Sequence, residues 1–592
     1  MEKWFVAAKK ADFDKWATEF HITPILVRIL RNRDLTEEKE IRRFLYGTLE
    51  DCHSPRLLKD MDKAVEQIGK AIANQSHIRI IGDYDVDGIC SSYILTKGVS
   101  ALGGRVDTAI PHRIHDGYGL NDHLIEQAKE DGVDLIVTCD NGIAAAAQIE
   151  LANRYGIKVI VTDHHEVPFE REESGAKKEI LPKALAVIDP KREGDSYPFP
   201  GICGAVVAFK LIQALSEKAG RPSDTELRKE LMDELLEFAA FATVCDVMEL
   251  KDENRILVRY GLERIRNTQN IGLQALMEVN RLDPSKISAY HLGFVLGPCL
   301  NATGRLDTAV RALELLQSRT KVEAMSAAAE LKELNDSRKN MTLDGVEQAV
   351  RYLKDNHLEQ DKVLVIFLPE VHESLAGIIA GRVKEKYNHP VFLLTRGEEG
   401  VKGSGRSVEG YHMYEAMVEV SWFFTKFGGH AMAAGLSMEE KDIEALRREL
   451  NERCRLTEED FVPKVHIDVP MPLCYGTREL AEELELLEPF GVGNPKPLFA
   501  QKNIVFCSGR KMGANQNFAR FQVRLPEGGT AQLVFFGDLE KFGTFLDKKY
   551  GPGSETALYE GKGQYEVSVV YQLGINTYRG QTEVQYILQH YC

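Results

Sequence analysis

The sequence lacks paired cysteines and long apolar runs. Its ten cysteines are scattered over 592 residues, and no two of them form a CxxC pair. That spacing argues against a structural zinc site and a disulfide framework, and it favours a reducing, cytoplasmic compartment. No apolar run approaches the ~20 residues that a bilayer-spanning helix needs. Acids and lysines interrupt the N-terminal MEKWFVAAKKADFDKW, so we expect neither a signal peptide nor a membrane segment.

A positive net charge is also lacking, since the formal charge is −16. Proteins that bind nucleic acids normally contact phosphates through Lys and Arg, so this total speaks against such a partner. However, carboxylates that hold metal ions are neutralised by the bound cations. The charge is also uneven, because residues 500–592 carry ten Lys and Arg against eight Asp and Glu. A local basic face can therefore coexist with an acidic body.

Four acidic clusters stand out against this background. Carboxylates interleaved with imidazoles are suitable ligands for two divalent cations. Two such cations about 3.5–4 Å apart commonly hydrolyse phosphodiesters or phosphoanhydrides. We therefore predict a metal-dependent phosphohydrolase. The clusters are Asp83-Tyr84-Asp85-Val86-Asp87, Asp140-Asn141-Gly142, Asp163-His164-His165 and Cys245-Asp246.

The first three clusters come directly after short apolar segments that read as strands. Helices are expected between them, at 89–102 and 144–154. Strands that alternate with helices indicate βαβ units and a parallel sheet, whose ligand sites lie beyond the carboxyl ends of the strands. This position supports one shared site. The expected strands are 77–81, 134–138, 157–161 and, ending at Asp189-Pro190, 185–188.

The remaining sequence divides into further regions. A long amphipathic helix is expected at 320–355, followed by a second α/β unit that ends in two glycine-rich turns, 403–407 and 428–430. Five alternating β-like runs after residue 465 predict a small barrel, and the OB-fold is the commonest nucleic-acid-binding barrel of this kind. The expected regions are a helical leader at 1–45, a catalytic parallel-sheet domain at 46–265, a helical connector at 266–355, a smaller α/β domain at 356–462 and the barrel at 463–592.

Each acidic cluster also has a plainer interpretation. The first could simply cap a helix, and its DxDxDG string begins like a calcium-binding EF-hand loop. That loop needs Glu at its twelfth position, where this chain has Ile94. Asp140 before Asn-Gly could be only a turn. Asp246, in an Ala-rich apolar helix, is hard to explain as a solvated residue, because an unpaired buried carboxylate is costly.

Two arginines that follow glycines are candidate phosphate ligands. Arg305 follows Gly304, and Arg406 follows Gly405. Arg binds phosphate in a bidentate manner, and Gly allows a close approach of the backbone. Both arginines are equally compatible with an ordinary surface position. His430, which follows Gly428-Gly429, is likewise either a substrate-binding residue or an ordinary surface residue.

Taken in order, these residues resemble the DHH superfamily of phosphoesterases. GDYDVDG, DNG and DHH match its first three motifs, TVCDV its fourth acidic motif, and GGHAMAAG its companion DHHA1 domain. Within that superfamily the chain is similar to the RecJ family of single-strand-specific exonucleases, through PRLLKDMDKAV, LNATGRL, GSGRS and LEPFGVGNPKPLF. The resemblance covers residues 50–590. It implies an α/β protein with a parallel-sheet DHH domain, a smaller α/β DHHA1 domain joined by a long helix, and a C-terminal OB-fold-like β-barrel.

The resemblance also implies roles for individual residues. His165 would contact the scissile phosphate, and Asp163 would orient the histidines from the second ligand sphere. Asp83 would be a metal ligand or a support. The ligands of two Mn²⁺ or Mg²⁺ ions would be Asp85, Asp87, Asp140 as the bridge, His164 and Asp246. The substrate-binding residues would be Arg305, Ser404 and Arg406 around a 5′-terminal phosphate, with Asn301 and His430. Two departures from the family pattern, Cys139 and Asp189, lie outside the ligand set.

The implied activity is 5′→3′ hydrolysis of single-stranded DNA to 5′-mononucleotides, in DNA repair and recombination. A narrow channel between the DHH and DHHA1 domains would exclude duplex, and the barrel would hold the strand on Phe518, Phe521 and Tyr571. The implied partners are single-stranded DNA, a single-stranded-DNA-binding protein and a helicase, and such a chain could act as a monomer.

Two alternatives stay open. The first is a phosphodiesterase of the same superfamily that acts on short oligonucleotides, cyclic dinucleotides or pyrophosphate. The chain length and the β-rich tail argue against it, since a small substrate needs no extra binding barrel. The second is a RecJ-like replication scaffold without activity, against which the complete set of metal ligands argues.

Overall fold

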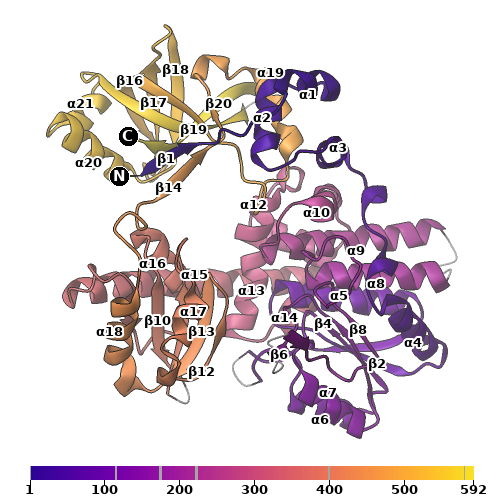
Figure 1. Cartoon of the computed structure of the whole chain (residues 1–592). Helices are drawn as coiled ribbons and strands as arrows, with labels where there is room; N and C mark the ends of the chain where they lie inside the picture. The colour runs from indigo at the N-terminus through magenta and orange to yellow at the C-terminus, as the bar shows by residue number, and fades with distance from the viewer. Residues whose placement is uncertain (1, 114–115, 172–176, 220–224, 398–399, 579) are drawn as a thin grey trace. The chain divides into compact units, whose positions relative to one another are not determined.

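The computed structural model describes residues 2–113, 116–171, 177–219, 225–397, 400–578 and 580–592. The chain forms two units (Figure 1). The barrel unit comprises Met1–Asp51, Glu249–Asp252 and Pro463–Cys592, and the α/β unit comprises Cys52–Met248 and Glu253–Val462. Among the helices described, none combines the length and the apolar content that crossing a bilayer requires.

The first part of the α/β unit is built on a five-stranded parallel sheet with the order β3-β2-β4-β5-β8. β2 (His77–Ile81), β4 (Leu135–Cys139) and β5 (Lys158–Thr162) are almost fully buried, which explains their continuous apolar sequences. β8 (Ala186–Ile188) confirms the fourth predicted strand. β3 (Arg105–Ala109) is a half-buried edge strand that the sequence pattern missed. The strand order reverses between β2 and β4, which creates the switch point where open α/β sheets bind ligands.

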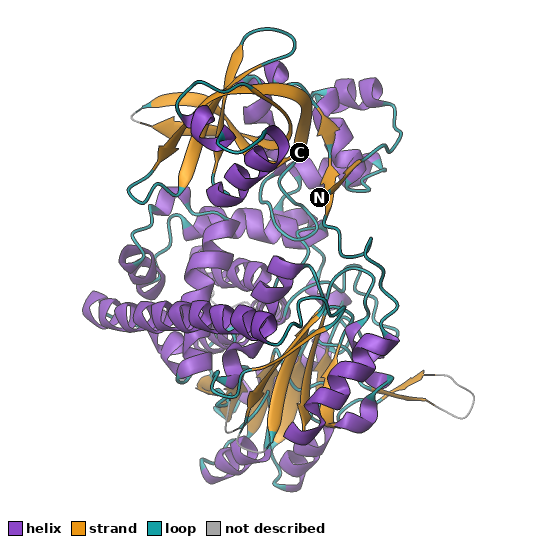
Figure 2. Ribbon diagram, turned by 90° about the vertical axis from the view of Figure 1, so that its left-hand side faces the viewer, coloured by secondary structure: helices purple, strands orange, loops and turns teal. Residues whose placement is uncertain are grey.

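Helices lie on both faces of this sheet (Figure 2). α5 (Val86–Ala101) packs against α8 and α9 and is buried along most of its length, as its apolar sequence requires. A short hairpin of β6 (Phe169–Arg171) and β7 (Lys177–Glu179) lies outside the sheet. The other helices are α4 (Met61–Ala73), α6 (Asp122–Glu130), α7 (Ala146–Arg154), α8 (Gly204–Ala219), α9 (Thr225–Cys245) and α10 (Asp252–Ile265).

A run of helices connects this sheet to the second one. The predicted long helix is confirmed as α15 (Lys321–Asp355), which begins with a capping box formed by Thr320 and Glu323. α12 (Ala289–His291) continues through a π-helical turn (Leu292–Leu296) directly into α13. The remaining helices are α11 (Ile271–Val279), α13 (Gly297–Leu306) and α14 (Val310–Leu316).

The second sheet has five strands in the order β12-β13-β11-β10-β9, of which only the β9–β10 pair is parallel. The prediction of two glycine-rich turns was wrong, because these glycines lie in strands β11 and β12. A Cβ atom added at Gly403 would lie 2.4 Å from the Leu394 side chain, and one added at Gly405 would lie 2.6 Å from the Met413 side chain. Glycine is therefore needed at both positions for the sheet to pack. The elements are β9 (Leu364–Phe367), α16 (Ala376–Tyr387), β10 (Val391–Arg396), β11 (Val401–Arg406), α17 (Met413–Val418), β12 (Phe424–Gly429), β13 (Ala433–Met438) and α18 (Ile443–Arg453).

The barrel unit contains the predicted five strands, closed by pairing of β16 with β19. The N-terminal helices contribute Leu26 and Phe44 to the same apolar core as the barrel strands, and β1 pairs with β14. The strands are β1 (Lys3–Val6), β14 (Lys464–Ile467), β15 (Val469–Pro470), β16 (Phe499–Met512), β17 (Phe518–Arg524), β18 (Thr530–Phe535), β19 (Tyr565–Tyr578) and β20 (Gln581–Tyr591). The helices are α1 (Phe13–Phe20), α2 (Pro24–Asn32), α3 (Glu38–Tyr46), α19 (Arg478–Glu483), α20 (Leu539–Tyr550) and α21 (Ser554–Tyr559).

Two of the three predicted base-stacking residues of the barrel belong to its core. Phe521 and Tyr571 have no exposed surface, because their positions in β17 and β19 face the interior. The Tyr571 hydroxyl donates a hydrogen bond to the Met471 carbonyl group (2.8 Å). The prediction was therefore wrong for these two residues. Phe518 is half-buried, and its ring centre lies 5.2 Å from the ring centre of Phe536, which is exposed.

Candidate functional site

The first acidic cluster occupies the sharp turn between β2 and α5. Asp85 caps α5, since its Oδ1 accepts hydrogen bonds from the backbone N–H groups of Asp87 (2.9 Å) and Gly88 (3.1 Å). A Cβ atom at position 88 would lie 2.4 Å from the Asp83 carbonyl oxygen, so the turn requires glycine. The turn therefore gathers three carboxylates at the carboxyl end of β2.

The start of α8 joins this turn to the second cluster. The carboxylate of Asp87 accepts hydrogen bonds from the N–H groups of Gly204 (2.7 Å) and Ala205 (2.8 Å), a favourable arrangement for negative charge at a helix N-terminus. A Cβ atom at position 204 would lie 2.7 Å from the Asp140 Cβ atom. Glycine thus permits Asp87 and Asp140 to approach the same helix start.

Asp140 and His164 lie at the centre of the site. Asp140 follows β4 with a φ of 59°, a left-handed conformation that Asp tolerates better than most residues. Its Oδ1 lies 3.1 Å from His164 Nε2 and 3.8 Å from His165 Nδ1. His164 Nε2 also lies 3.5 Å from Asp87 Oδ2 and 3.7 Å from Asp246 Oδ2. One imidazole nitrogen therefore faces three carboxylates from three different segments.

Three groups of these side chains each bring their ligand atoms within 4.8 Å of one another. Asp140 belongs to two of the groups, and His164 also belongs to two. Carboxylate oxygens with few imidazoles suit Mg²⁺ or Mn²⁺, and the sharing of Asp140 suits a bridge between two ions. The groups are Asp83, Asp85 and Asp140; Asp87, His164 and Asp246; and Asp140, His164 and His165.

The buried carboxylates carry more negative charge than their surroundings compensate. Burial, reinforced by the charge of Asp85, raises the pKa of Asp87 to about 6. Burial and the charge of Asp87 raise the pKa of Asp246 to about 7. Burial and neighbouring carboxylates also hold the pKa values of Asp83 and Asp140 well above the usual range. Bound divalent cations would remove this repulsion, so the residues present fit a two-metal site.

Asp163 holds the two histidines in place. Its Oδ1 accepts hydrogen bonds from the backbone N–H of His164 (2.8 Å) and from Nδ1 of His165 (2.7 Å), and its Oδ2 accepts one from the Ile143 N–H (2.9 Å). Burial alone would lower the pKa of His165, but the hydrogen bond and charge of Asp163 raise it to about 9. Burial and the charge of His165 lower the pKa of His164. The two neighbouring imidazoles therefore differ in charge, and the neutral His164 suits a metal better than the cationic His165 does.

Sequence reasoning missed three residues beside the candidate metal ligands. The Tyr118 hydroxyl donates a hydrogen bond to the Asp140 carbonyl group (2.7 Å) and lies 3.2 Å from the His165 ring nitrogens. The Arg113 guanidinium lies 4.7 Å from the centre of the Tyr84 ring, in a cation–π contact. Arg113 and Tyr118 follow β3, and the failure to predict that strand removed the signal that would have placed them.

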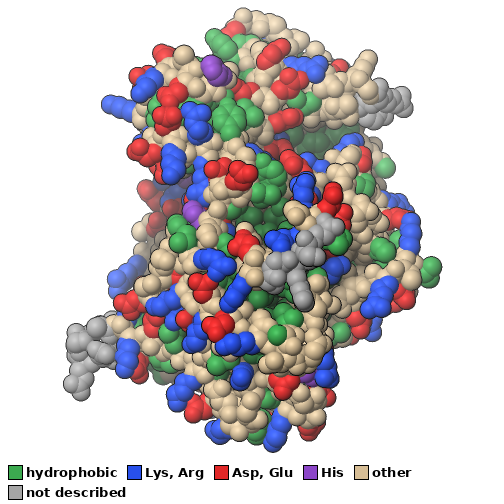
Figure 3. Space-filling model, turned by 90° about the vertical axis from the view of Figure 1, so that its right-hand side faces the viewer, with side chains coloured by type: hydrophobic (Ala, Val, Ile, Leu, Met, Phe, Trp, Pro, Cys, Tyr) green, Lys and Arg blue, Asp and Glu red, His purple; other side chains and the backbone are tan. Residues whose placement is uncertain are grey.

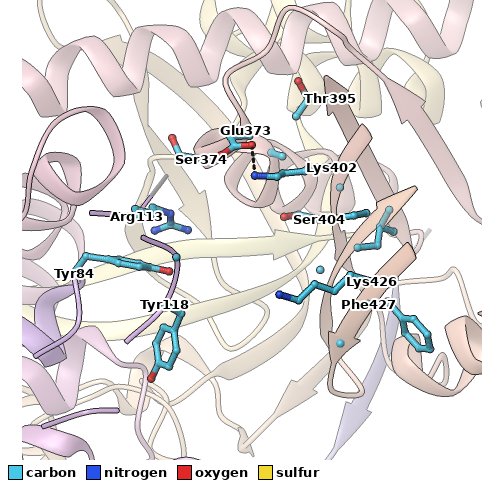
Figure 4. A pocket seen from close by; sticks show the side chains of 17 residues that line it. Tyr84, Arg113, Tyr118, Glu373, Ser374, Thr395, Lys402, Ser404, Lys426 and Phe427 are labelled. Carbon is cyan, nitrogen blue, oxygen red and sulfur yellow. Dashed lines mark ion pairs between the residues drawn. The ribbon is translucent and has the colours of Figure 1, made fainter. Parts of the chain in front are cut away.

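These three residues form one wall of a cavity of about 540 Å³ (Figure 4). The opposite wall comes from the second sheet, where Ser404 and Lys426 lie on β11 and β12. Figure 4 shows the Lys426 ammonium group pointing into the cavity, and Lys402 in an ion pair with Glu373 (3.0 Å). The cavity adjoins the candidate metal ligands, because its lining residue Tyr84 lies between Asp83 and Asp85 in the chain.

The two predicted arginines meet at the start of α16. Arg305 Nη1 donates a hydrogen bond to the Ser374 carbonyl group (2.7 Å), and Arg406 Nη1 donates one to the Gly405 carbonyl group (2.7 Å). A Cβ atom at position 377 would lie 2.7 Å from Arg406 Nη2 and 3.5 Å from the Ser404 hydroxyl oxygen. The structure thus brings Arg305, Ser404 and Arg406 to the N-terminal turn of one helix.

Arg305 has cationic neighbours. Burial and the charges of Arg113 and Arg338 lower the pKa of Arg305 to about 10. Burial likewise lowers the pKa of Arg406. Positive groups that repel one another at a helix N-terminus form a suitable site for a phosphate.

The other two predicted substrate residues lie in different surroundings. The Asn301 Oδ1 accepts a hydrogen bond from the Val86 N–H (3.2 Å), next to the first acidic cluster. His430 is exposed at the turn between β12 and β13, where its N–H donates to the Ala433 carbonyl group (2.8 Å). It is not one of the residues that line the cavity described above. A contact of His430 with a substrate stays a prediction.

Three segments of the chain match known protein families. Residues 77–243 match the DHH family N-terminal domain, residues 360–456 the DHHA1 domain and residues 467–590 the RecJ OB domain. The candidate metal ligands from Asp83 to His164 lie in the first segment. Ser404, Arg406 and His430 lie in the second. The match of the third segment agrees with the closed barrel.

The chain is also similar to curated and solved proteins over most of its length. It is 34% identical to the single-stranded-DNA-specific exonuclease RecJ of Bacillus subtilis (strain 168), covering 99% of this chain and 70% of that protein. It is 34% identical to RecJ of Escherichia coli (strain K12), covering 96% of each. The crystal structure of RecJ from Thermus thermophilus in complex with Mn²⁺ superposes with a TM-score of 0.80 at 27% identity, covering 100% of this chain and 79% of that one. The Mg²⁺ complex gives a TM-score of 0.73 at 25% identity, covering 100% and 78%.

Proposed function

The chain belongs to the RecJ family of single-stranded-DNA-specific exonucleases, and on that basis we propose that it releases 5′-mononucleotides from the 5′ end of single-stranded DNA by metal-assisted hydrolysis. One observation supports this proposal above the others. Asp140 and His164 each belong to two of the three ligand groups, and these groups adjoin a cavity lined on its far side by Ser404, next to which Arg305 and Arg406 lie at the start of α16. Such an arrangement suits a strand whose 5′-terminal phosphate lies at the arginines while the next phosphodiester lies at the metal site.

The chain's own carboxylates define where two cations would sit. Asp83 and Asp85 with Asp140 would hold one ion, and Asp87, His164 and Asp246 would hold the other, with Asp140 as the bridge. Bound Mn²⁺ or Mg²⁺ would activate the attacking water and offset the charge that develops on phosphorus. The N–H groups at the start of α8 keep Asp87 oriented, so this ligand is preorganised.

His165 would act on the scissile phosphate as a cation. Asp163 raises its pKa to about 9, so that the imidazolium form dominates at neutral pH. Its Nε2–H would donate a hydrogen bond to a phosphate oxygen in place of the Tyr118 hydroxyl, which lies 3.2 Å from both ring nitrogens. A charge-assisted hydrogen bond of this kind becomes stronger as the phosphate gains negative charge.

The 5′→3′ direction of hydrolysis would follow from the proposed phosphate pocket of Arg305, Ser404 and Arg406. A 5′-terminal phosphate held by Arg305, Ser404 and Arg406 leaves the first nucleoside in the cavity beside Tyr84 and Tyr118. The next phosphodiester would then face Asp140. Internal phosphates carry one charge less and a bulky ester group, so the pocket would favour ends over internal positions.

The barrel unit would bind the remainder of the strand. Phe518 and the exposed Phe536, whose rings are tilted by 32° relative to each other, offer two neighbouring rings for bases. Despite the net charge of −16, Lys and Arg side chains are interspersed with acidic ones over the face in Figure 3. We therefore expect affinity for single-stranded DNA to weaken as salt rises, through counterion release. Affinity that stays constant from low to high salt would contradict this binding mode.

The broader cellular role follows from the same family relationship. We infer that the protein acts in DNA repair and recombination in the cytoplasm, with a single-stranded-DNA-binding protein and a helicase as partners. A chain that carries its own binding barrel needs no second copy for substrate retention, so we infer a monomer. Light scattering on the purified protein would test the last point.

A nuclease time course with Mn²⁺ tests the proposed activity. The substrates are a long single strand labelled at its 5′ or its 3′ end and the matching duplex. We expect early release of labelled mononucleotide from the 5′ end only, with the duplex spared. The Asp140→Ala variant, which removes the shared ligand, should be inactive.

The two alternatives predict other outcomes of the same assay. An enzyme for short oligonucleotides, cyclic dinucleotides or pyrophosphate would leave the long strand intact and hydrolyse the small compounds. An inactive scaffold would show no metal-dependent release from any of these substrates.

A further inference from the structure

One continuous helical segment, residues 289–306, runs along the edge of the metal site. At one end, the Leu292 carbonyl group in the π-helical turn accepts a hydrogen bond from Cys245 Sγ (3.5 Å), directly beside Asp246. At the other end, Asn301 accepts the hydrogen bond from the Val86 N–H (3.2 Å). A Cβ atom at Gly304 would lie 2.4 Å from the Tyr84 carbonyl oxygen. The segment therefore connects the Asp246 side of the site to its Asp83–Asp87 side.

Five accessible residues of this segment follow one another along one face of the helix as a stripe, and His291, Gly293, Val295 and Leu306 are also not buried. The five recur every three or four residues, as positions on one helix face do. The N-terminal part of the stripe is the more exposed, whereas the C-terminal part reaches the predicted phosphate pocket. Its members are Tyr290, Phe294, Pro298, Asn301 and Arg305, none of which is buried.

Two aromatic side chains at the N-terminal end of the stripe are largely exposed to solvent. Tyr290 is 63% exposed and Phe294 is 68% exposed. Their ring centres lie 5.1 Å apart with an angle of 26° between the planes, so the rings are stacked on each other. Aromatic side chains of this size normally contribute to a core. Phe294 lies in the π-helical turn and Tyr290 in α12 directly before it, and π-helical turns are often found at functional sites.

We propose that Tyr290 and Phe294 form a base-stacking platform for the part of the single strand that lies 3′ of the scissile phosphate. This inference rests on the proposed exonuclease activity and adds a binding site to it. Phe294 lies eleven residues from Arg305, about 16 Å along a helix. At the ~3.4 Å spacing of stacked bases, that distance corresponds to about five nucleotides, and to fewer in an extended strand.

A nucleobase fits the surface better than a protein partner does. Within residues 289–306 the exposed large apolar side chains are Tyr290 and Phe294, and the preceding turn is polar, with Asp283, Ser285 and Lys286 exposed. A stable protein interface would need a surface of roughly 1,000 Å² or more. The stripe also leads to Arg305 at the predicted phosphate pocket, which gives it continuity with the path of a strand.

Kinetics on long and short substrates test the platform. The double variant Tyr290→Leu/Phe294→Leu keeps apolar side chains of good helix propensity but removes both aromatic faces. For a 5′-phosphorylated 30-mer, we expect KM to rise about tenfold or more, because each base–aromatic stack contributes severalfold or more to affinity. KM for a 5′-phosphorylated dinucleotide, which is too short to reach the rings, should stay unchanged.

Two further variants make the kinetic test specific. Tyr290→Phe/Phe294→Tyr exchanges the rings and should restore the KM of the wild-type protein. Trp422→Ala removes a 63% exposed aromatic residue elsewhere in the α/β unit and should leave both KM values unchanged. Equal losses on the long and the short substrate would indicate damage to the metal site and would overturn the platform.

A fluorescence experiment locates the contact without any cleavage. In an Asp140→Ala background, 2-aminopurine is placed in turn at positions 2–10 of a 5′-phosphorylated strand. Quenching should peak at about positions 3–6 and disappear in the double Leu variant. If the double Leu variant cleaves the 30-mer like the wild type and the quenching is unchanged, the platform is refuted while the exonuclease stands. If the wild type neither cleaves nor binds single strands, the proposed activity fails and the platform fails with it.

Discussion

His165 Nδ1 lies 2.7 Å from Asp163 Oδ1, and the same carboxylate oxygen also accepts the backbone N–H of His164 (2.8 Å). One aspartate therefore sets both the orientation and the charge of the histidine that faces the predicted position of the phosphate. The adjacent Asp189 is also buried, but its Oδ1 accepts the Lys191 N–H (2.8 Å) and makes no hydrogen bond to either histidine in the described part of the chain.

Asp163→Asn should shift the pH dependence of hydrolysis. In the native protein the pKa of His165 is raised to about 9, so the cationic form is present at low pH and lost only as the pH rises through that value. Without the aspartate charge, His165 should lose its proton at a lower pH. We expect kcat to fall about 10- to 100-fold at pH 8 and clearly less at pH 6. Asp189→Asn removes a buried carboxyl group that makes no hydrogen bond to either histidine in the described part of the chain, so this matched control should shift the profile less. A uniform loss at every pH in Asp163→Asn would contradict the charge argument.

The stabilisation of the fold by Mn²⁺ should increase with pH. Without a bound cation, burial and neighbouring carboxylates raise the pKa of Asp87 to about 6 and that of Asp246 to about 7. A carboxyl group with a raised pKa stabilises the metal-free fold at low pH, and that contribution is lost as the pH rises through 6 to 7. Protons also compete with the metal, so Mn²⁺ affinity should fall roughly tenfold per pH unit for each proton displaced.

Thermal denaturation between pH 5.5 and 8, with Mn²⁺ or with a chelator, measures this effect. The difference in Tm between the two conditions should grow with pH. A difference that is constant or that shrinks toward pH 8 would show that these carboxyl groups do not bind the metal.

Arg406→Ala should reduce the preference for 5′-phosphorylated ends. The loss of a charge-assisted contact to a phosphate corresponds to about 1.5–3 kcal/mol, or roughly 10- to 150-fold in kcat/KM. Mn²⁺ binding should be unchanged, because Arg406 belongs to none of the ligand groups. Arg406→Lys keeps the charge but not the bidentate geometry and should give an intermediate loss. Equal losses on 5′-hydroxyl and 5′-phosphate strands would remove Arg406 from the pocket.

Phe521→Ala should destabilise the barrel unit much more than Phe518→Ala does. The Phe521 ring is fully buried, and its centre lies 5.3 Å from the ring centre of Phe506 and 5.0 Å from that of Phe542. Its removal therefore leaves a cavity and lowers the free energy of unfolding by about 3–5 kcal/mol. Phe518 is only half-buried, and its truncation should cost about 1 kcal/mol.

Tryptophan fluorescence can follow the barrel unit alone. The chain has three tryptophans, and Trp4 and Trp16 both pack against apolar clusters of the barrel unit. In a Trp422→Phe background, urea denaturation would therefore report that unit. Similar midpoints for Phe521→Ala and Phe518→Ala would contradict the assignment of Phe521 to the core.

The sequence by itself determined where the acidic ligands gather. β2, β4 and β5 are buried on both faces, so their apolar runs were visible in the sequence, and the residue that ends each run was therefore known. In a parallel sheet the carboxyl ends of neighbouring strands meet at one edge, so Asp83, Asp140 and Asp163 had to lie close together. The long helix α15 and the number of barrel strands also followed from local periodicity.

Only the tertiary structure decided which other side chains reach that edge and which face of each barrel strand is inside. β3 is a half-buried edge strand with a weak apolar pattern, so the loop that delivers Arg113 and Tyr118 could not be placed. Phe521 and Tyr571 were taken for surface residues because strand alternation fixes two faces but does not say which one barrel closure turns inward. Burial and register depend on contacts between distant segments, and such contacts leave no mark on the local pattern from which a single sequence is interpreted.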